Sequence, residues 1–524
     1  MAYVPPIGIP APSFGIDEVA GSYTHYVDRT HPSATDTSNP NGSASTPRLT
    51  VPTTLEAGSV CEVHGTGYTL GTTTWTLNGT SGSPVFIKGV GAPTFTGSST
   101  VLTIAGSYGI VEGLDIINQQ IRFGVSGGAA ATYMCLRASE ARGWTNTNTS
   151  SMIGANVSSP VSHDLVLYDL EVHDNGVLGA GNDFHGVKWS GTGLYNCWYL
   201  DSLSYNNDGD TIQIGSASGT VEPWPEFLYI GRVTGHNDTE NYCDFKQCRD
   251  VIVSEGVGYG YEQSVASGGV CGVVHNGTVR CWFLFNAFHS SRLGIQGTGQ
   301  EALYVIGNVF YNLARVESDT AETSLGTGGN AVQVRGHTGD LLIVNNTVHD
   351  CTRGFYLESS AGSPQIINNI VHGLKGAGAM VGFDNTTVHT NATIEDNLFD
   401  TSATPCRVQI SSTRHMTLAA YIAAHPTKGA GCLEGDPDFV NSGIRNYDIN
   451  ETSDAVGVAA ADHAVYSTFN TTYGRSIQYD KDGLARPQGG SWDMGAYEYA
   501  AAQEGSGVNT AKKRRSVLLL DLPF

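Results

Sequence analysis

A short apolar strand, an asparagine and a second short strand recur along much of this chain, and this repeat limits the folds open to it. Clear copies are EALYVIGNVFYN at 301–312, DLLIVNNTVHD at 340–350, SPQIINNIVHG at 363–373 and ATIEDNLFD at 392–400. Strands this short cannot bury an apolar face alone, so each must stack on its equivalent in the next repeat. The repeat predicts one continuous solenoid core rather than several globular domains.

The central asparagines of these copies are Asn308, Asn346, Asn369 and Asn397, with separations of 346 − 308 = 38, 369 − 346 = 23 and 397 − 369 = 28 residues. Such variation is typical of coils whose strands are constant while their turns take insertions. Stacked about 4.8 Å apart, the asparagines can bond to one another and satisfy the turn backbone. We predict an all-β fold, a right-handed parallel β-helix, over a propeller with regular blades or a sandwich without this pattern.

Composition along the chain predicts five regions. They are a Pro-rich extended segment at 1–24, an N-terminal cap with the first coils at 25–105, a β-helix core with the active site at 106–434, closing coils at 435–500 and a tail at 501–524. The N-terminus has no basic region followed by an apolar one, so it does not resemble a secretory signal. The apolar run near the C-terminus is too short to cross a bilayer.

The net charge of −22 comes from 49 acidic and 27 basic residues. This balance argues against a nucleic-acid partner, which needs clustered Lys and Arg. The ten cysteines are spread along the chain without a C-x-x-C pair. We expect buried thiols that act as small apolar side chains, and a bridge between Cys406 and Cys432 or between Cys271 and Cys281 remains an alternative.

Three consecutive segments in the middle of the chain carry the residue types that chemistry needs. They are GNDFHGVKWSG at 181–191, SYNNDGDTIQIG at 204–215 and TENYCDFKQCRDV at 239–251. Residues about one coil apart in sequence lie nearly above one another in a β-helix. We therefore expect the three segments to meet on one side of the column.

Stacking would gather Asp183, Asp208 and Asp210 into one carboxylate cluster, with Lys246 beside it, because 208 − 183 = 25 and 246 − 210 = 36. Such a cluster suits a hard cation such as Ca²⁺, which takes oxygen ligands and relieves the repulsion between like charges. Near the cation, a partly buried lysine can lose its proton and act as a base. This chemistry fits removal of the α-proton of a uronate, followed by β-elimination.

The same segments resemble the ninth family of polysaccharide lyases, the calcium-dependent pectate lyases. That family carries A-D-G-F-A-x-K, then N-x-D-D-G-W-D, then N-G-F-K; the counterparts here are residues 182–188, 206–210 and 243–246. The resemblance implies a right-handed parallel β-helix, Asp183, Asp208 and Asp210 as calcium ligands and Lys246 as the Brønsted base. The middle motif here has two acidic residues where the family has three, and an alternative alignment places Gln213 on the last position.

Other residues near these motifs are candidates for substrate contacts. Lys188 and His185 lie within the first segment, and Arg249 lies near the end of the third. A cationic or imidazole side chain can bind the carboxylate of an acidic polysaccharide. Each also has an ordinary structural role as an alternative, in a surface ion pair, a turn or the core.

The end of the chain carries a second resemblance. GDPDFVNSGIRNYDINETSDAVG at 435–457 and DGLARPQGGSWDMGAYEY at 482–499 resemble the closing segment of many extracellular β-helix proteins. The similarity concerns the fold and not the activity. Because an open solenoid end exposes unpaired strand edges, we expect this segment to cap it.

Two other classes of function remain open. A glycoside hydrolase on the same fold would use paired carboxylates among Asp208, Asp210, Asp238, Glu240 and Asp244. A virion tail-spike or adhesin would bind glycan, and a tail-spike depolymerase would combine this role with cleavage. We expect an extracellular or phage-virion protein that binds an acidic polysaccharide but neither nucleic acid nor membrane, as a monomer or, for a tail-spike, a trimer.

Overall fold

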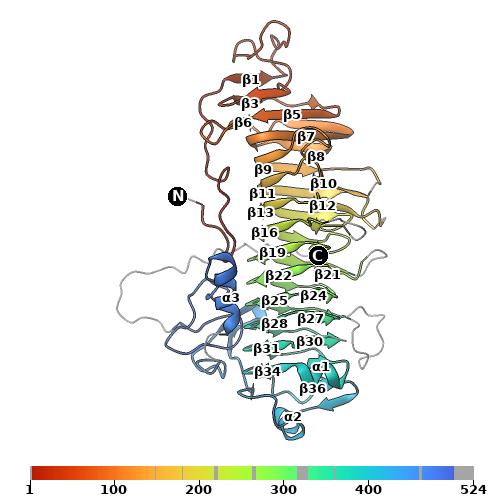
Figure 1. Ribbon diagram of the computed structural model, residues 1–524, viewed down its shortest axis with the longest axis vertical. Helices are drawn as coiled ribbons and strands as arrows, with labels where there is room; N and C mark the ends of the chain where they lie inside the picture. Colours follow the sequence, from red (N-terminus) through yellow and green to blue (C-terminus); the bar gives the residue numbers. More distant parts are fainter. Residues whose placement is uncertain are drawn as a thin grey trace.

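The computed structural model describes residues 3–147, 149–179, 181–216, 222–262, 267–275, 277–314, 328–358, 362–459 and 463–500. In this part the chain winds into one column of coils, whose axis is vertical in Figure 1. Strands pair in parallel with their equivalents in the next coil. The arrangement confirms the predicted parallel β-helix. The predicted tail at 501–524 lies outside the described residues.

Three parallel ladders run along the column. The first contains β13 (Tyr195–Leu200), β16 (Glu226–Gly231), β19 (Arg249–Ser254), β22 (Val279–Leu284), β25 (Leu303–Ile306), β28 (Leu341–Val344), β31 (Gln365–Ile367) and β34 (Thr393–Glu395). The second contains β14 (Leu203–Asn207), β17 (Thr234–His236), β20 (Val257–Tyr259), β23 (Ala287–His289), β26 (Val309–Tyr311), β29 (Thr347–His349), β32 (Ile370–His372), β35 (Leu398–Phe399) and β38 (Leu433–Glu434). The third contains β8 (Asp115–Phe123), β10 (Ser150–Ala155), β12 (Phe184–Trp189), β15 (Ile212–Ile214), β18 (Cys243–Phe245), β21 (Val270–Val274), β24 (Leu293–Thr298), β27 (Asn330–Arg335), β30 (Arg353–Glu358), β33 (Ala379–Phe383) and β36 (Cys406–Ile410).

The N-terminal coils combine short strands with the three long strands β7, β9 and β11. They are β1 (His25–Asp28), β2 (Thr54–Glu56), β3 (Val60–His64), β4 (Tyr68–Thr69), β5 (Thr73–Asn78), β6 (Val85–Gly89), β7 (Thr94–Glu112), β9 (Ala131–Arg142) and β11 (His163–Asn175). Strand β7 runs without a break through the predicted boundary at residue 105, and it pairs with strands on both sides of that boundary. The first coils and the core therefore form one continuous stack.

The predicted asparagine ladder is present inside the turn between the first and second ladders. The backbone N–H of Asn308 donates to Oδ1 of Asn346 at 2.9 Å, and the same bond joins Asn346 to Asn369 at 2.9 Å and Asn369 to Asn397 at 3.0 Å. Asn286 extends the ladder by one coil, since its N–H donates to Asn308 at 2.9 Å. All five side chains are fully buried, so the ladder satisfies turn groups that water cannot reach.

The residue before each ladder asparagine explains the paired letters of the repeat. Asn345, Asn368 and Asp396 have φ of 54°, 58° and 52°, and Gly307 has φ of 68°. Gly tolerates this left-handed conformation because it has no Cβ atom, and Asn and Asp tolerate it because their short polar side chains can bond locally. The first letter of each pair therefore turns the chain, and the second forms the ladder.

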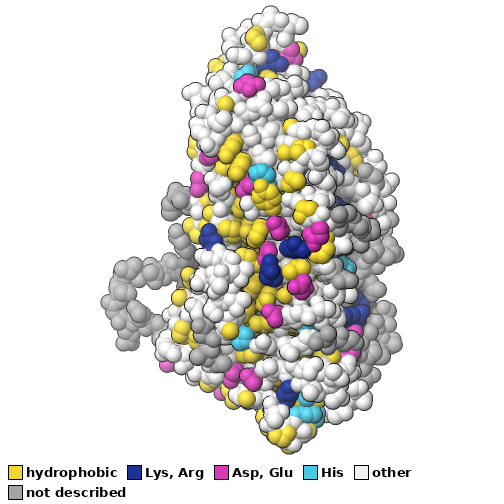
Figure 2. Space-filling model, viewed as in Figure 1, with side chains coloured by type: hydrophobic (Ala, Val, Ile, Leu, Met, Phe, Trp, Pro, Cys, Tyr) yellow, Lys and Arg dark blue, Asp and Glu magenta, His cyan; other side chains and the backbone are white. Residues whose placement is uncertain are grey.

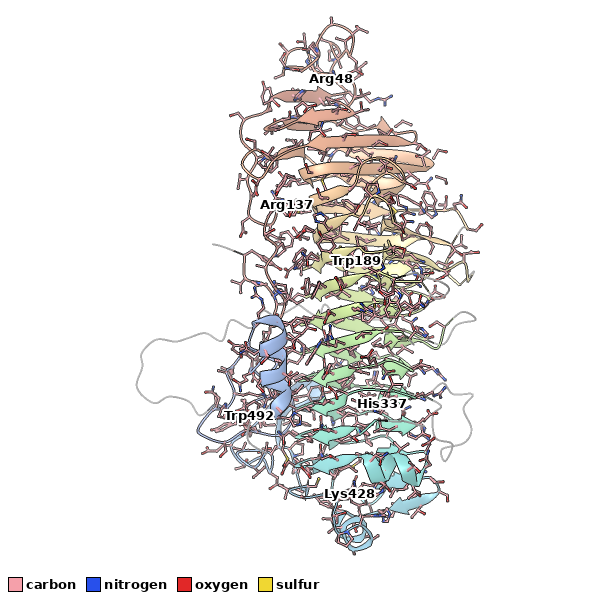
Figure 3. All side chains as sticks on the ribbon, viewed as in Figure 1. Arg48, Arg137, Trp189, His337, Lys428 and Trp492 are labelled. Carbon is pink, nitrogen blue, oxygen red and sulfur yellow. The ribbon has the colours of Figure 1, made fainter. Side chains whose placement is uncertain are left out.

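The N-terminal segment runs along the outside of the first ladder, as Figure 1 shows. Nε1 of Trp198 donates to the carbonyl of Pro10 at 2.8 Å, and Oγ of Ser254 donates to the carbonyl of Ile7 at 2.7 Å. Arg137, labelled in Figure 3, donates to the carbonyl of Ile16 at 3.1 Å. These bonds fix an extended segment that has no strand partner of its own.

The lower end of the column is closed differently from the prediction. The third ladder ends in an antiparallel hairpin between β36 and β37 (Thr413–His415), beside α1 (Thr386–Asn391) and α2 (Leu418–Ala424). The predicted closing segment includes β39 (Phe439–Asn441), a 3₁₀ turn at Ser442–Ile444, β40 (Asn446–Ile449) and α3 (Ala464–Tyr473).

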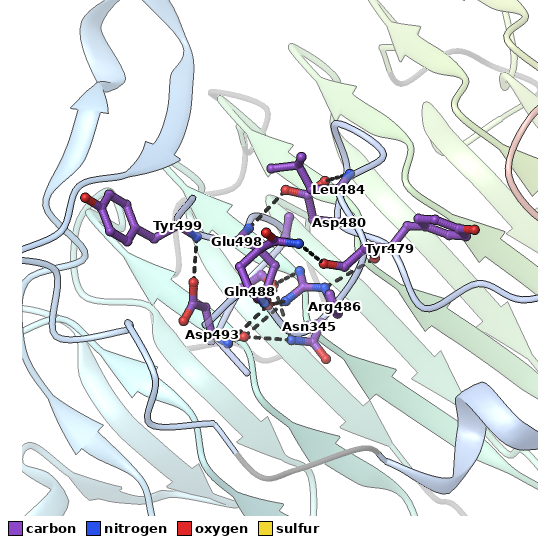
Figure 4. Close-up of polar contacts among 12 residues, drawn as sticks. Asn345, Tyr479, Asp480, Leu484, Arg486, Gln488, Asp493, Glu498 and Tyr499 are labelled. Atoms are coloured by element: carbon purple, nitrogen blue, oxygen red, sulfur yellow. Dashed lines mark hydrogen bonds and ion pairs between the residues drawn. The ribbon is translucent and has the colours of Figure 1, made fainter. Parts of the chain in front are cut away.

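This segment packs on the side of the column rather than over its end. Nε1 of Trp282 donates to the hydroxyl of Tyr473 at 3.0 Å, and Gly495 N–H donates to the carbonyl of Asn368 at 2.7 Å. A buried ion pair between Arg486 and Glu498, 2.6 Å apart, holds the segment together, and Figure 4 shows the polar contacts around it. It covers apolar outer surface, whereas the hairpin and α2 cover the strand edges.

All ten cysteines are buried and unpaired, as predicted, and neither proposed bridge forms. Among the described residues, no helix combines the length and the apolar character that a membrane crossing requires.

Candidate active site

The third ladder turns one column of side chains outward. Lys188 on β12, Gln213 on β15 and Asp244 on β18 are direct neighbours in the parallel register. The residues on both sides of Lys188, Val187 and Trp189, are buried in the core, and Figure 3 labels Trp189 at this level of the column. Since adjacent strands lie about 4.8 Å apart, the three outward side chains form one continuous surface. The candidate site is built on it.

Asp183, His185 and Asp210 meet where the chain enters this ladder. Nε2 of His185 lies 3.1 Å from Oδ1 of Asp183, and Nδ1 lies 3.1 Å from Oδ2 of Asp210. The backbone N–H of Asp210 donates to Nδ1 at 3.1 Å, so the neutral ring carries its proton on Nε2. The ring is fully buried, and burial lowers the pKa of His185 to about 4. The imidazole is therefore neutral at pH 7.

Asp210 is a buried carboxyl that is only half satisfied. Its Oδ1 accepts from the backbone N–H of Asn241 at 3.1 Å and from the Asn241 amide at 2.8 Å. Within the described part of the chain, neither Oδ2 of Asp210 nor Oδ1 of Asp183 accepts a hydrogen bond, although both atoms are buried. Burial, followed by the charges of Asp244 and Asp183, raises the pKa of Asp210 well above its usual range. Burial, followed by Asp210, raises the pKa of Glu240 to about 9.

Lys246 stands directly beside this group. Its Nζ lies 2.6 Å from Oδ2 of Asp244, and Nε2 of His275 lies 3.1 Å from the other oxygen, Oδ1. Burial opposes the charge on Asp244, but the bond from His275 and the charge of Lys246 outweigh it and lower the pKa of Asp244. Burial also opposes the charge on Lys246, and Asp244 outweighs it, so the pKa of Lys246 is raised.

Asp238 holds the turn that carries Asp210. Its Oδ1 accepts from the backbone N–H of Asn207 at 2.7 Å and from the Asn207 amide at 2.8 Å, while its Oδ2 accepts from the hydroxyl of Thr211. One buried carboxyl thus ties together both ends of the turn. Gly209 lies inside it, where a Cβ atom would come within 2.7 Å of Nδ1 of His185. A side chain there would displace the ring that separates the two aspartates.

The structure brings four of the predicted residues together: Asp183, Asp210, Lys188 and Lys246. The role of Asp208 as a calcium ligand stays a prediction, since the structure places it outside the closest group. Ligand atoms of Asp183, His185 and Asp210 all lie within 4.8 Å of one another, and Asp208 is not in this group. Its Oδ2 instead accepts from the backbone N–H of Asn182 at 3.1 Å, because the turn directs it toward the preceding loop.

Two predicted substrate contacts also differ from expectation. His185 has no exposed surface, so its ring orients the two aspartates rather than meeting a substrate. Arg249 begins β19, beyond the corner that follows Lys246, and its guanidinium lies 2.5 Å from Glu222 and stacks on Trp224 at 5.1 Å. Gln213, the alternative metal ligand, lies in the outward column between Lys188 and Asp244.

Sequence reasoning missed His275 and gave Glu240 and Asp244 only to the hydrolase alternative. His275 follows Lys246 by 275 − 246 = 29 residues, which is about one coil. The same stacking argument that joined Asp183 to Lys246 would have found it. The sequence spacing gave no such signal for Glu240. Its closeness to Asp210 and Asp183 depends on how the turn before β18 folds.

The donor set around Asp183 and Asp210 fits a divalent cation. Among the described residues, Oδ1 of Asp183 and Oδ2 of Asp210 are buried oxygens that accept no hydrogen bond. Burial, together with the charges of Asp244 and Asp183, raises the pKa of Asp210, so a cation would satisfy both oxygens at once. The oxygens and the adjacent Glu240 suit calcium. The nitrogen of His185 in the same group is a ligand that transition metals prefer, but Nδ1 already accepts from the backbone N–H of Asp210.

Comparison with known sequences identifies the fold. Residues 234–419 match the family described as "Right handed beta helix region". Together with the parallel ladders, this match shows that the chain is a right-handed parallel β-helix. No curated protein matches the chain.

Three solved structures with a similar chain fold are the following enzymes. A mutant of the PL6 family alginate lyase AlyGC is 14% identical over 78% of this chain and 56% of its own, with a TM-score of 0.46. Pectate lyase Pel9A is 11% identical over 91% and 98%, with a TM-score of 0.40. The GH136 lacto-N-biosidase from Eubacterium ramulus is 13% identical over 78% and 67%, with a TM-score of 0.40. This chain thus spans little more than half the length of the alginate lyase.

Proposed function

We propose that this chain is a polysaccharide lyase that cleaves a uronic-acid-containing polymer by β-elimination, with Lys246 as the base and calcium as the cofactor. One observation carries the proposal: Asp183 and Asp210 meet where the chain enters the third ladder, within the field of Lys246, and in the described part of the chain one buried oxygen of each accepts no hydrogen bond. A rigid scaffold that holds like charges this close together is adapted to a cation. A lysine beside such a group is adapted to proton transfer.

A divalent cation held by Asp183 and Asp210 would withdraw charge from the substrate carboxylate and acidify the proton at C5. Nζ of Lys246 accepts that proton. The electron pair forms the C4=C5 double bond while the bond from C4 to the glycosidic oxygen breaks, and this oxygen takes a proton from solvent. Lys188, two ladder steps from Asp244, pairs with a substrate carboxylate.

The charge around Lys246 sets the conditions for this chemistry. Asp244 raises the pKa of Lys246, whereas a base must start as the neutral amine. A bound cation would neutralise the negative charge of the surrounding carboxylates, and this would lower the pKa of Lys246. We therefore expect the rate to rise with pH, and to depend on the cation even where substrate still binds.

The test is to incubate the protein with polygalacturonate and alginate, with calcium and then with chelator, and to follow the ultraviolet absorbance of the unsaturated product. Lys246→Ala should lower kcat by about a hundredfold or more without loss of calcium binding. The matched control is Lys88→Ala, which removes a lysine paired loosely with Glu62 at 3.9 Å in the N-terminal coils. Full activity of Lys246→Ala would show that the base is another residue.

Glycoside hydrolysis is the second candidate, favoured by the opposite pKa shifts of Glu240 and Asp244. Glu240 stays protonated at neutral pH, and Asp244 stays ionised. This is the pattern of a general acid with a base or nucleophile. Release of reducing sugar without the unsaturated chromophore would exclude the lyase. Loss of that release in Glu240→Gln would establish the hydrolase.

A further inference from the structure

A second cationic position lies on the same outward column, nearer the N-terminal end. Arg122 on β8 is followed in the parallel register by Gly154, Lys188, Gln213 and Asp244. These are four ladder steps, and at about 4.8 Å for each step Arg122 lies about 19 Å from Asp244 along the axis. Arg122 therefore faces the same side of the column as the candidate active site, but beyond the reach of its side chains.

The guanidinium of Arg122 is surrounded by uncharged acceptors. Nη2 donates to Oε1 of Gln120 at 2.7 Å and to Oγ of Ser150 at 2.5 Å, and Nη1 donates to the carbonyl of Ser151 at 3.0 Å and to its Oγ at 3.3 Å. Burial alone lowers the pKa of Arg122 to about 10. Among the described residues no carboxylate pairs with it, which is unusual for a largely buried charge.

The surroundings are arranged to hold the guanidinium in place. A Cβ atom at Gly154 would lie 2.6 Å from Nη1 of Arg122, so only glycine lets the guanidinium lie across this strand. The hydroxyls of Ser150 and Ser151 accept from Arg122, and each therefore retains its own proton to donate. A fixed cation with two adjacent O–H donors is a site for an anion.

We infer that Arg122, Ser150 and Ser151 form a distal subsite that binds a carboxylate of a long acidic polysaccharide lying along the third ladder. The spacing of the ladder supports this, because a pyranose in an extended polymer advances by nearly one strand spacing. A chain that reaches from Lys246 to Arg122 then spans several sugars. The inference rests on the proposed function for its ligand class, but it concerns binding and not cleavage.

The test measures affinity against chain length. Oligogalacturonates with two to eight sugars are titrated calorimetrically, with calcium present, into Lys246→Ala and into the same variant carrying Arg122→Ala. We expect Arg122→Ala to weaken binding of the octamer about tenfold, the worth of a charge-assisted bond, and to leave the dimer unchanged. Arg142→Ala is the matched control, since Arg142 is already paired with Asp115 and Glu140.

Equal octamer affinity with and without Arg122, or an equal loss for dimer and octamer, would overturn the inference. Arg122→Gln guards against misfolding, because it keeps a donor for the serines while it removes the charge. It should show the same length-dependent loss with an unchanged melting temperature. If the intact protein never forms unsaturated product but the octamer-specific loss persists, the lyase proposal fails and the subsite stands.

Discussion

Asn346→Ala tests whether the asparagine ladder stabilises the coils. In the wild type, Nδ2 of Asn346 donates to the carbonyls of Val305 and Val344 at 2.9 and 3.2 Å and to Oδ1 of Asn369 at 3.0 Å. Its Oδ1 accepts from the backbone and side chain of Asn308 at 2.9 and 3.0 Å. Alanine removes all five bonds and leaves buried groups of both neighbouring coils unsatisfied.

Each stranded buried group costs about 1–3 kcal/mol, so two or three of them cost about 4 kcal/mol in all. Unfolding a chain of this length carries an entropy of about 1 kcal/mol/K, and the melting temperature should fall by about 4 °C if the column unfolds as a unit. The assay is thermal denaturation followed by circular dichroism. The matched control is Asn391→Ala, which removes an exposed asparagine at the end of α1.

Asn346→Asp separates the donor from the acceptor. It keeps an oxygen for Asn308 but places a second oxygen against the carbonyls of Val305 and Val344. At neutral pH the melting temperature should therefore fall further than in Asn346→Ala. In acid, where the carboxyl is protonated, the difference should become smaller. If both variants melt within the error of Asn391→Ala, the ladder contributes nothing and the reasoning is refuted.

Two further predictions concern buried charge. Asp210 and Glu240 have raised pKa values, about 9 for Glu240 against 4.5 when unperturbed, so without a cation the free energy of unfolding should fall as pH rises from about 4.5 to about 9. Calcium must displace these protons, so its affinity, measured by calorimetry, should increase over the same range with proton release; a flat profile would contradict this. Glu498→Gln strands the buried Arg486, 2.6 Å away, and should cost about 3–5 kcal/mol, seen as earlier proteolysis of the closing segment. Glu434→Gln should cost less, because Glu434, which pairs with Arg407 at 2.6 Å, is 25% exposed.

The sequence alone determined the architecture because the repeat is local. Each strand needs only a few alternating residues, and four of the five ladder turns place a left-handed Asn, Asp or Gly before the asparagine, as at 345–346 and 368–369. Phe285, with a φ of 56°, takes that position before Asn286. Stacking then follows from burial, whatever the turns insert. The same logic placed Asp183, Asp210 and Lys246 on one side of the column.

The composition of the site was decided by tertiary structure. Whether Asp208 or Asp210 joins Asp183 depends on the turn between them, which the distant carboxyl of Asp238 holds from the next coil. The letters N-N-D-G-D, with two aspartates in one turn, permit either arrangement.

Charge follows the same division. The sequence supplies the number of carboxyls and lysines, and Figure 2 shows acidic and basic side chains intermixed on the face that it presents. Only burial and distance decide which of them titrate abnormally. The pKa of Glu240 is raised and that of Asp244 is lowered, although both residues precede Lys246 by only a few positions. A strand pattern encodes which way a side chain points, but its electrostatic environment comes from coils that are distant in sequence.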